Sequence, residues 1–229
     1  MMRLDDIDEA FWASTEEQAG WHQTFLDRQG VPETYAMYGH VFECPGGVYH
    51  PDEASSTRFL LREAHLWAPR FGPRVLDLGT GCGAVGIVLA GMGKEVTATD
   101  IDPLAVAAAQ ANVERNGARV SVRRSDLFEA VRGERFDLIV FNPPLRDRAV
   151  EHEVEHIASD PDGSLLRRFL REAPQHLAPE GHVAFITASF GARTTLLDEL
   201  PSFDHHVAAA EYSRLAGGMF RWLVFAKPR

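Results

Sequence analysis

The stretch "FDLIVFNPPLRD", residues 136–147, ends an apolar run on a polar amide, Asn142, which is followed by Pro143 and Pro144. The side-chain oxygen of Asn142 and the carbonyl of Pro143 can both accept hydrogen bonds from one nitrogen, because proline fixes φ and holds its own C=O at one angle. Such acceptors draw a delocalised lone pair toward tetrahedral geometry and aim it at an electrophile. The stretch predicts chemistry at nitrogen; a plain strand-ending turn is the alternative.

A glycine loop, "LDLGTGCGAVG", occupies residues 76–86. Glycine lets the backbone turn tightly and lets a ligand lie against the main chain, while the helix that follows offers free N–H groups. The letters also contain G-x-G-x-x-G, which fits a dinucleotide, so NAD is one candidate ligand. A tight turn without a ligand is the other alternative.

Acidic residues near this loop narrow the choice of ligand. Asp100, in "TATDID", ends the next expected strand, where a carboxylate can accept both hydroxyls of a ribose, which fits NAD and adenosyl ligands alike. Asp77 precedes the glycines, where it suits a ligand with an ammonium and a sulfonium and would repel a pyrophosphate. Asp126 and Leu127, in "SDLF", would meet the edge and the face of an adenine, although a helix N-cap is the alternative for Asp126. This pattern favours S-adenosylmethionine.

The elements that must position these residues alternate from Pro73 onward, which predicts an α/β fold with a doubly wound Rossmann-like sheet. Seven strands are expected, at 74–79, 95–100, 119–126, 136–142, 181–189, 205–215 and 220–228, with a turn at Gly217-Gly218 between the last two. Helices are expected at 53–67, capped by Ser55 or Ser56, and at 84–93, 103–117, 164–177 and 193–200.

Residues 1–50 precede this pattern and form the first of two expected domains. Phe11, Trp12, Trp21 and Phe25 have the spacing of amphipathic helices, and "YAMYGHVFECPGGVY" predicts a hairpin or lid at 35–49. We therefore expect an N-terminal helical cap and lid over residues 1–50 and a catalytic domain over residues 51–229.

Four segments together carry a family resemblance: "VLDLGTGCGAVGIVLA", "VTATDIDPLAVAAAQANVERNG", "SDLF" and "FDLIVFNPPL". They resemble the class I S-adenosylmethionine-dependent methyltransferases over roughly residues 48–190. Asn-Pro-Pro is similar to the motif of the amino-methyltransferases, and "GVYHPDEASSTRFLLREA" and "DPDGSLLRRFLREAPQHLAPEGHV" are similar to segments of the HemK-like glutamine methyltransferases of peptide release factors. The resemblance implies S-adenosylmethionine as cofactor.

The residue patterns and the resemblance together give a set of candidate site residues. Asn142 and Pro143 are the catalytic candidates, and Pro144, Leu145, Tyr49 and His50 are the candidates for binding the acceptor. The cofactor candidates are Asp77, Gly79, Thr80, Gly81, Gly83, Asp100, Ile101, Asp126, Leu127, Asn142 and Thr57.

The sequence departs from the family at Leu145, where an aromatic residue is usual. An aromatic side chain there stacks on a planar acceptor, whereas leucine gives an apolar wall without a stacking preference. That favours an acceptor less flat than a nucleobase, such as a side-chain amide, an amine or a small metabolite. The following segment, "RDRAVEHEVEHIASD" at 146–160, is either a lid over the acceptor or a solvated loop.

Composition bounds the remaining possibilities. A net charge of −10 over 229 residues makes nucleic acid an unlikely partner and ranks RNA guanine third among acceptors. Cys44 and Cys82 lack metal-ligand spacing, so we expect free thiols. The N-terminus is too polar for a signal peptide, so we expect a cytoplasmic protein. No apolar run nears the roughly 20 residues that span a bilayer, so no membrane role is expected. His152 and His156 lie four apart without a third ligand, so no metal is expected.

The function that these residues favour is methyl transfer from S-adenosylmethionine to a nitrogen, with a glutamine-type amide or an amine as acceptor. A small-molecule N- or O-methyltransferase is the first alternative. An NAD-dependent oxidoreductase and a non-catalytic cofactor-binding protein are alternatives from other classes. The acceptor is therefore expected to be a protein or a small molecule, and the sequence does not predict an oligomeric state.

Overall fold

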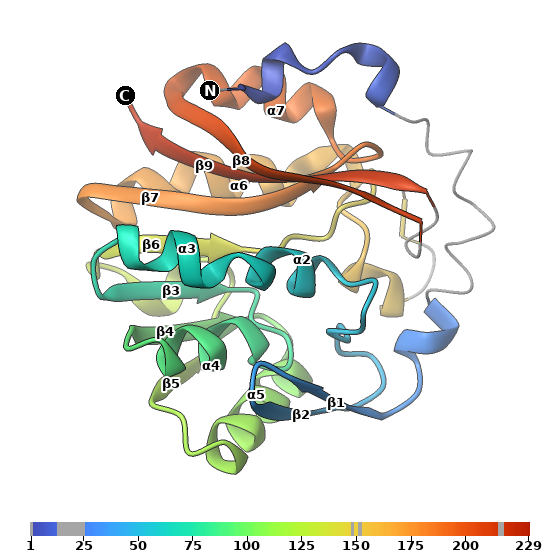
Figure 1. Ribbon diagram of the computed structural model, residues 1–229, viewed down its shortest axis with the longest axis vertical. Coiled ribbons are helices and arrows are strands. Elements are labelled where there is room, and N and C mark those ends of the chain that lie inside the picture. Colours follow the sequence, from blue (N-terminus) through green and yellow to red (C-terminus); the bar gives the residue numbers. More distant parts are fainter. Residues whose placement is uncertain (1, 13–25, 148, 151–152, 215–217) are drawn as a thin grey trace.

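A seven-stranded sheet forms the centre of the protein, in the order β5-β4-β3-β6-β7-β9-β8 (Figure 1). The computed structural model describes residues 2–12, 26–147, 149–150, 153–214 and 218–229. Neighbours among β3 to β7 pair in parallel, whereas β9 pairs antiparallel with both β7 and β8. The predicted α/β class and all seven predicted strands are confirmed.

The strands are β3 (Arg74–Leu78), β4 (Glu95–Asp100), β5 (Val120–Arg124), β6 (Phe136–Phe141), β7 (Leu177–Ala188), β8 (Phe203–Ser213) and β9 (Met219–Pro228). The helices are α2 (Ser56–Arg62), α3 (Ala64–Trp67), α4 (Ala84–Gly91), α5 (Pro103–Arg115), α6 (Ser164–Glu172) and α7 (Arg193–Glu199). Ser55 caps α2 as predicted, by accepting from the backbone N–H of Arg58. The helix predicted at 164–177 ends at Glu172, because Pro174 cannot continue an α-helix, and a 3-10 turn leads into β7.

The central strands β3 and β6 are mostly apolar because both faces of the sheet are covered. On β6, Leu138 and Val140 join the hydrophobic cluster that contains α2, α3 and α4, whereas Ile139 and Phe141 join the cluster that contains α6 and α7. Figure 1 shows α2 to α5 on one side of the sheet and α6 on the other. Two cores, one on each face, therefore hold the carboxyl ends of the parallel strands in fixed positions.

A separate hairpin, β1 (Glu33–Met37) and β2 (His40–Cys44), confirms the hairpin predicted at 35–49. Asn112 of α5 and Asn116, the residue that follows this helix, hold it by hydrogen bonds to the backbone of β2. Asn112 Oδ1 accepts from Glu43 N at 2.9 Å, and Asn116 Oδ1 accepts from Val41 N at 3.0 Å. The asparagine amides thus satisfy an outer strand edge that pairs with no strand in the described part of the chain.

The N-terminal residues 2–12 contain two 3-10 helices, Leu4–Asp6 and Glu9–Phe11, instead of the predicted amphipathic helix. They lie against the antiparallel end of the sheet: the Trp12 and Trp222 rings are 5.0 Å apart, and Met2 O accepts from Val207 N at 2.9 Å. The aromatic side chains therefore pack on β9 and not on a helical neighbour. Trp21 and Phe25, the other half of the predicted pattern, lie outside the described residues.

Candidate functional site

A cavity of about 1170 Å³ lies at the carboxyl ends of β3, β4 and β6. Its walls come from the loops that follow these strands, from the approach to α2 and from residues 156–161. In a parallel sheet the carboxyl ends open toward one edge, where the chain leaves the strands in different directions. Most of the predicted site residues line this cavity: Tyr49, Thr57, Asp77, Gly79, Thr80, Gly81, Asp100, Ile101, Asp126, Asn142, Pro143, Pro144 and Leu145.

The glycine loop supplies one wall with its backbone. Gly79 and Gly81 have φ values of 63° and 56°, which side-chain-bearing residues rarely adopt. A Cβ at Gly81 would lie no closer than 3.9 Å to any other atom, so space is open beside this part of the loop. Thr80 N donates to Thr99 O at 2.9 Å and fixes the loop on β4. A ligand can therefore lie directly on the main chain here.

Asp77 is the buried carboxylate at the base of the loop. Its Oδ2 accepts from Thr80 Oγ1 at 2.5 Å and from Gly86 N at 2.9 Å. Burial raises the pKa of Asp77 to about 7, which outweighs these two hydrogen bonds, and the nearby charge of Asp100 adds to the rise. Among the described residues no donor reaches Oδ1. A cationic group bound there would restore the charged carboxylate.

Asp100 lies at the carboxyl end of β4, as predicted. Its Oδ2 accepts from Gly81 N at 2.9 Å and its Oδ1 from Asp102 N at 3.0 Å, while burial raises its pKa. Asp126 lines the cavity and pairs with Arg168 at 3.2 Å. Asp126 is not a side-chain helix cap; the hydroxyl of Ser125 has that role and accepts from Ala130 N at 2.9 Å.

Asn142 follows β6 directly and turns into the cavity. Its Nδ2 donates to Thr57 Oγ1 at 3.2 Å, which fixes the amide plane from α2. Its Oδ1 is buried and has no hydrogen-bond partner among the described residues. An unpaired buried acceptor costs about 1 to 3 kcal/mol, so a ligand donor is the expected partner of this oxygen. The nitrogen-binding arrangement predicted from "NPP" requires such an open acceptor on Asn142.

An apolar wall continues from Asn142 along one side of the cavity. Leu145 packs against a small cluster that contains Phe190 and Met219, and the guanidinium of Arg146 lies 5.3 Å from the ring centre of Phe190. Phe190 follows β7, and Met219 begins β9, which runs antiparallel and so starts at the same edge of the sheet. The wall beside Leu145 thus includes an aromatic ring from a different strand.

Residues 153–160 form a folded wall of the cavity, so within this range the lid alternative is favoured over the solvated loop. A 3-10 helix spans Glu153–Ile157, and Arg146 pairs with Ser159 in an isolated parallel bridge. Ala158, Ser159 and Asp160 are buried and line the cavity. His152, half of the suggested histidine pair, lies outside the described residues, and no group of three possible metal ligands occurs within them.

Three predicted site residues do not line the cavity. Gly83 faces α5, where an added Cβ would meet Ala109 Cα at 3.2 Å, so this glycine allows close helix packing and not ligand approach. Leu127 has a φ of 43° that turns its side chain into the core beside Phe128. His50 is fully buried and its Nδ1 lies 3.1 Å from Tyr35 Oη, which indicates a structural role.

His40 and Tyr38, from the segment 35–49 that was expected to form a hairpin or lid, also lie away from the cavity lining. His40 lines a second hollow at the opposite end of the sheet, and Tyr38 is an exposed residue of the hairpin turn. Tyr49 does line the cavity. Its hydroxyl accepts from Ser56 N at 3.1 Å, and burial raises the pKa of this hydroxyl. Sequence reasoning missed several lining residues: Arg146, Ser159, Asp160, Arg168, Phe190 and Met219. Phe190 was detectable, because it directly follows the predicted strand 181–189.

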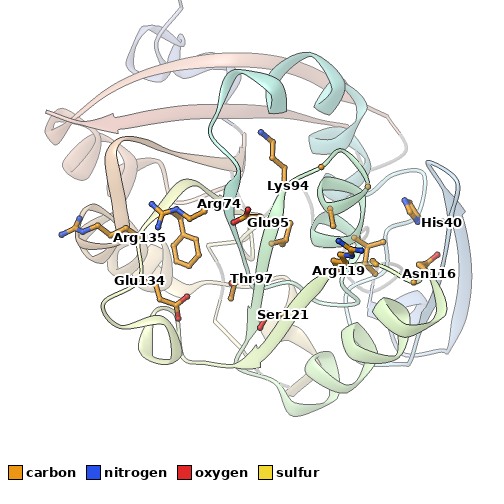
Figure 2. Close-up of a pocket in the computed structure, with 18 of the residues that line it drawn as sticks. His40, Arg74, Lys94, Glu95, Thr97, Asn116, Arg119, Ser121, Glu134 and Arg135 are labelled. Atoms are coloured by element: carbon orange, nitrogen blue, oxygen red, sulfur yellow. The ribbon is translucent and has the colours of Figure 1, made fainter.

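The second hollow, shown in Figure 2, has a volume of about 1090 Å³ and lies at the amino ends of the parallel strands. Charged side chains line it, the basic Arg74, Lys94, Arg119 and Arg135 and the acidic Glu95 and Glu134. Lys94 Nζ already donates to Phe71 O at 2.7 Å, and Arg135 Nη1 to Leu177 O at 2.8 Å. Two of its basic side chains therefore serve the protein's own backbone.

The cavity at the carboxyl ends fits S-adenosylmethionine. The open Oδ1 of Asp77 suits an ammonium, and Asp100 at the end of β4 suits the hydroxyls of a ribose. When charged, the carboxylate of Asp77 beside the loop would repel a pyrophosphate, which disfavours the NAD-type arrangement on electrostatic grounds. The fold and this site define a class I S-adenosylmethionine-dependent methyltransferase.

The comparison with known families agrees. The family model "Methyltransferase small domain" matches residues 42–214. The release factor glutamine methyltransferase of Bordetella pertussis is 36% identical over 185 residues, which cover 72% of this chain and 68% of that protein. The chain belongs to the methyltransferase small domain family and is an S-adenosylmethionine-dependent methyltransferase. This assignment sets aside the NAD-dependent oxidoreductase and the non-catalytic binding protein.

RNA methyltransferases are also similar to this chain. The ribosomal RNA small subunit methyltransferase C of Alcanivorax borkumensis is 30% identical over 200 residues, 82% of this chain and 57% of that protein. The structure of the T. thermophilus 16S rRNA N2 G1207 methyltransferase in complex with AdoMet and guanosine matches with a TM-score of 0.62 at 27% identity. The match covers 87% of this chain but only 50% of that one. A negative net charge alone therefore does not exclude RNA as a partner.

No helix among the described residues has both the length and the apolar character that a membrane crossing requires.

Proposed function

We propose that this enzyme methylates the side-chain amide nitrogen of a glutamine in a protein. The observation that carries the proposal is the buried, unpaired Oδ1 of Asn142 at the end of β6, in the same cavity as Asp77 and Asp100. Its position suits an N–H donor on the acceptor. The similarity to release factor glutamine methyltransferases, at 36% identity for the one from Bordetella pertussis, supports a release factor as the protein.

The chain's own residues would act on the acceptor by orientation. Asn142 Oδ1 and the carbonyl of Pro143 would accept the two N–H bonds of the amide, which weakens the delocalisation of its lone pair and points that pair into the cavity. Thr57 would hold the amide plane of Asn142, through the 3.2 Å hydrogen bond from Nδ2. Bound S-adenosylmethionine supplies a methyl group on a sulfonium, an already activated leaving group.

Leu145 fits this acceptor better than a nucleobase. A leucine beside Asn142 offers contact to an alkyl chain, and it lacks the flat face that stacks on a planar ring. Phe190 packs in the same cluster as Leu145, and the guanidinium of Arg146 already lies over its ring. The acceptor side of the cavity therefore suits an amide on an aliphatic stem.

The exocyclic N2 of guanine in ribosomal RNA is the second candidate acceptor. The structural similarity to the T. thermophilus enzyme, which is bound to guanosine in its complex, favours it. A guanine amine would use the same acceptors, Asn142 Oδ1 and Pro143 O. The net charge of −10 is unfavourable for an RNA surface.

Methyl-labelled S-adenosylmethionine distinguishes these acceptors. The enzyme would be incubated separately with unmethylated bacterial release factor, with small-subunit ribosomal RNA and with a small-molecule extract. We expect label in the release factor, and mass spectrometry of its peptides should place one methyl group on a glutamine side chain. Label confined to RNA, or to the small-molecule extract as the metabolite alternative predicts, would overturn the proposal.

A further inference from the structure

A second buried polar atom without a partner lies in the cavity, the hydroxyl of Ser159. Ser159 is 4% exposed, and its Oγ has no hydrogen-bond partner in the part of the chain that the structure describes. Among the described residues that line the cavity, it is the one side-chain hydroxyl that is both buried and unpaired. Because a buried hydroxyl without a partner destabilises the folded protein, a ligand contact is the expected compensation.

The backbone fixes Ser159 beside the loop that carries Asn142. Arg146 N donates to Ala158 O at 2.9 Å, and Asp160 N donates to Arg146 O at 2.8 Å, so Ser159 sits between two hydrogen bonds to one residue. That residue, Arg146, is four positions after Asn142 in the chain. On the other side, the carboxylate of Asp160 accepts from the first backbone N–H groups of α6, Leu165 N at 2.8 Å and Leu166 N at 2.9 Å. Ser159 is therefore held by the Asn-Pro-Pro loop and by a helix.

Asn142 and Pro143 cannot bind every polar atom of a carboxamide acceptor, because they offer no donor to its carbonyl oxygen. Both supply acceptors, which suit the two N–H bonds, whereas the carbonyl oxygen of the amide needs a donor. A hydroxyl is a neutral donor, and it can satisfy this oxygen without drawing as much electron density from the nitrogen as a cation would. We propose that Ser159 Oγ–H donates to the carbonyl oxygen of the acceptor carboxamide.

This inference rests on the proposed function, because it requires an acceptor with an amide carbonyl. Ser159 then acts in binding and selection of the acceptor, since its hydrogen bond is present before and during transfer. An interaction of equal strength in both states changes KM and leaves kcat nearly unchanged. A site built to bind a carbonyl also discriminates against an amine that lacks one.

The test is the Ser159→Ala variant, with Thr99→Val as its matched control. Thr99 Oγ1 is also buried and unpaired, but Thr99 lies on β4 and does not line the cavity. With release factor as acceptor, we expect Ser159→Ala to raise KM about tenfold, to keep kcat within about threefold and to keep the dissociation constant of S-adenosylhomocysteine. Both variants should keep or raise the melting temperature of the free protein, and Thr99→Val should keep KM.

The outcomes separate the two proposals. If the parent enzyme methylates glutamine but Ser159→Ala keeps its KM within twofold, the role of Ser159 is wrong and the proposed function stands. A rise in KM together with a lower melting temperature and weaker binding of S-adenosylhomocysteine indicates a structural role and also contradicts the inference. A parent enzyme that labels RNA and no carboxamide contradicts the proposed function, and this inference with it.

Discussion

The two ends of the parallel strands carry hollows of similar size and different character. The hollow at the carboxyl ends has a volume of about 1170 Å³, and the one at the amino ends about 1090 Å³. Among the described residues, Asn142 Oδ1 and Ser159 Oγ are buried without partners at the carboxyl ends, whereas no residue lining the amino-end hollow has such an atom. Volume does not distinguish a site; unsatisfied polar groups and buried charges do.

The direction of the strands explains the difference. At the carboxyl ends the chain leaves the sheet through loops, such as those at Gly79–Gly81 and Asn142–Pro144, whose backbone is free to face a ligand. At the amino ends the side chains of Lys94 and Arg135 donate to backbone carbonyls of the protein. The first end is organised for binding, and the second for stability.

The largest effect on cofactor binding is expected from β4, which has one acidic residue at each end. Asp100→Ala should weaken binding of S-adenosylhomocysteine about 100-fold, because it removes a charged acceptor for two ribose hydroxyls. Glu95→Ala, at the amino end of the same strand, should leave the dissociation constant unchanged. Isothermal titration calorimetry measures both. Equal losses in the two variants would contradict the assignment of the cofactor to the carboxyl end.

A smaller effect is expected from pH, through Asp77. The pKa of Asp77 is raised from its ordinary value of 3.8 to about 7, so below about pH 7 the carboxyl must lose a proton to bind an ammonium. The affinity for S-adenosylhomocysteine should therefore fall by up to about tenfold per unit as pH drops from 7 to 5.5. Asp77→Asn should bind more weakly and with a flat pH profile. A sloping profile in Asp77→Asn would assign the dependence to another group.

The same pKa shift affects the stability of the free protein in the opposite direction: cofactor affinity should rise with pH, whereas stability should fall. The folded state holds the proton of Asp77 more tightly than the unfolded chain, so ionisation of this group lowers stability. Its contribution to the free energy of unfolding therefore falls as pH rises from about 4 to about 7. Urea denaturation of the parent and of Asp77→Asn across this pH range measures the contribution of Asp77. The free energy of unfolding of the variant should lack the pH dependence that Asp77 causes in the parent.

The smallest effect is expected on stability, from two ion pairs at opposite ends of the strands, one with a buried arginine and one exposed. At the carboxyl end, buried Arg221 pairs with Glu211 and donates to Ala54 O at 2.6 Å, which fixes the approach to α2. Glu211→Gln should lower the free energy of unfolding by about 1 to 3 kcal/mol. At the other end Glu180 is exposed beside Lys227, and Glu180→Gln should cause no measurable change. Chemical denaturation measures the free energy of unfolding of both variants. Equal values for Glu211→Gln and Glu180→Gln would contradict the account.

Much of the site was predictable because the motifs lie next to the strand ends. The apolar run of β6 ends at Asn142, and β4 ends at Asp100, so the carboxyl-end rule brings both residues to one cavity. The seven strands and the hairpin at 35–49 also followed from local patterns. These features depend on short stretches of sequence.

The places where the cavity lining differs from the predicted set depend on contacts between distant segments. Gly83 is a glycine because of α5, more than 20 residues later, and no local signal separates that reason from ligand approach. Leu127 turns away from the cavity through its positive φ. Ser159 reaches the cavity through its bridge to Arg146, and Met219 through the antiparallel strand β9. The position of neither residue in the sequence indicates that it lines the cavity.

The most direct test of the central claim is the turnover of Asn142→Ala, with Asn116→Ala from the amino-end hollow as its control. If Asn142 orients the acceptor nitrogen, kcat for methyl transfer should fall about 1000-fold, while the dissociation constant of S-adenosylhomocysteine stays within about threefold. Asn116→Ala should keep kcat and lose only some stability, because Asn116 holds the hairpin. An Asn142→Ala enzyme that keeps kcat within tenfold of the parent would contradict the account.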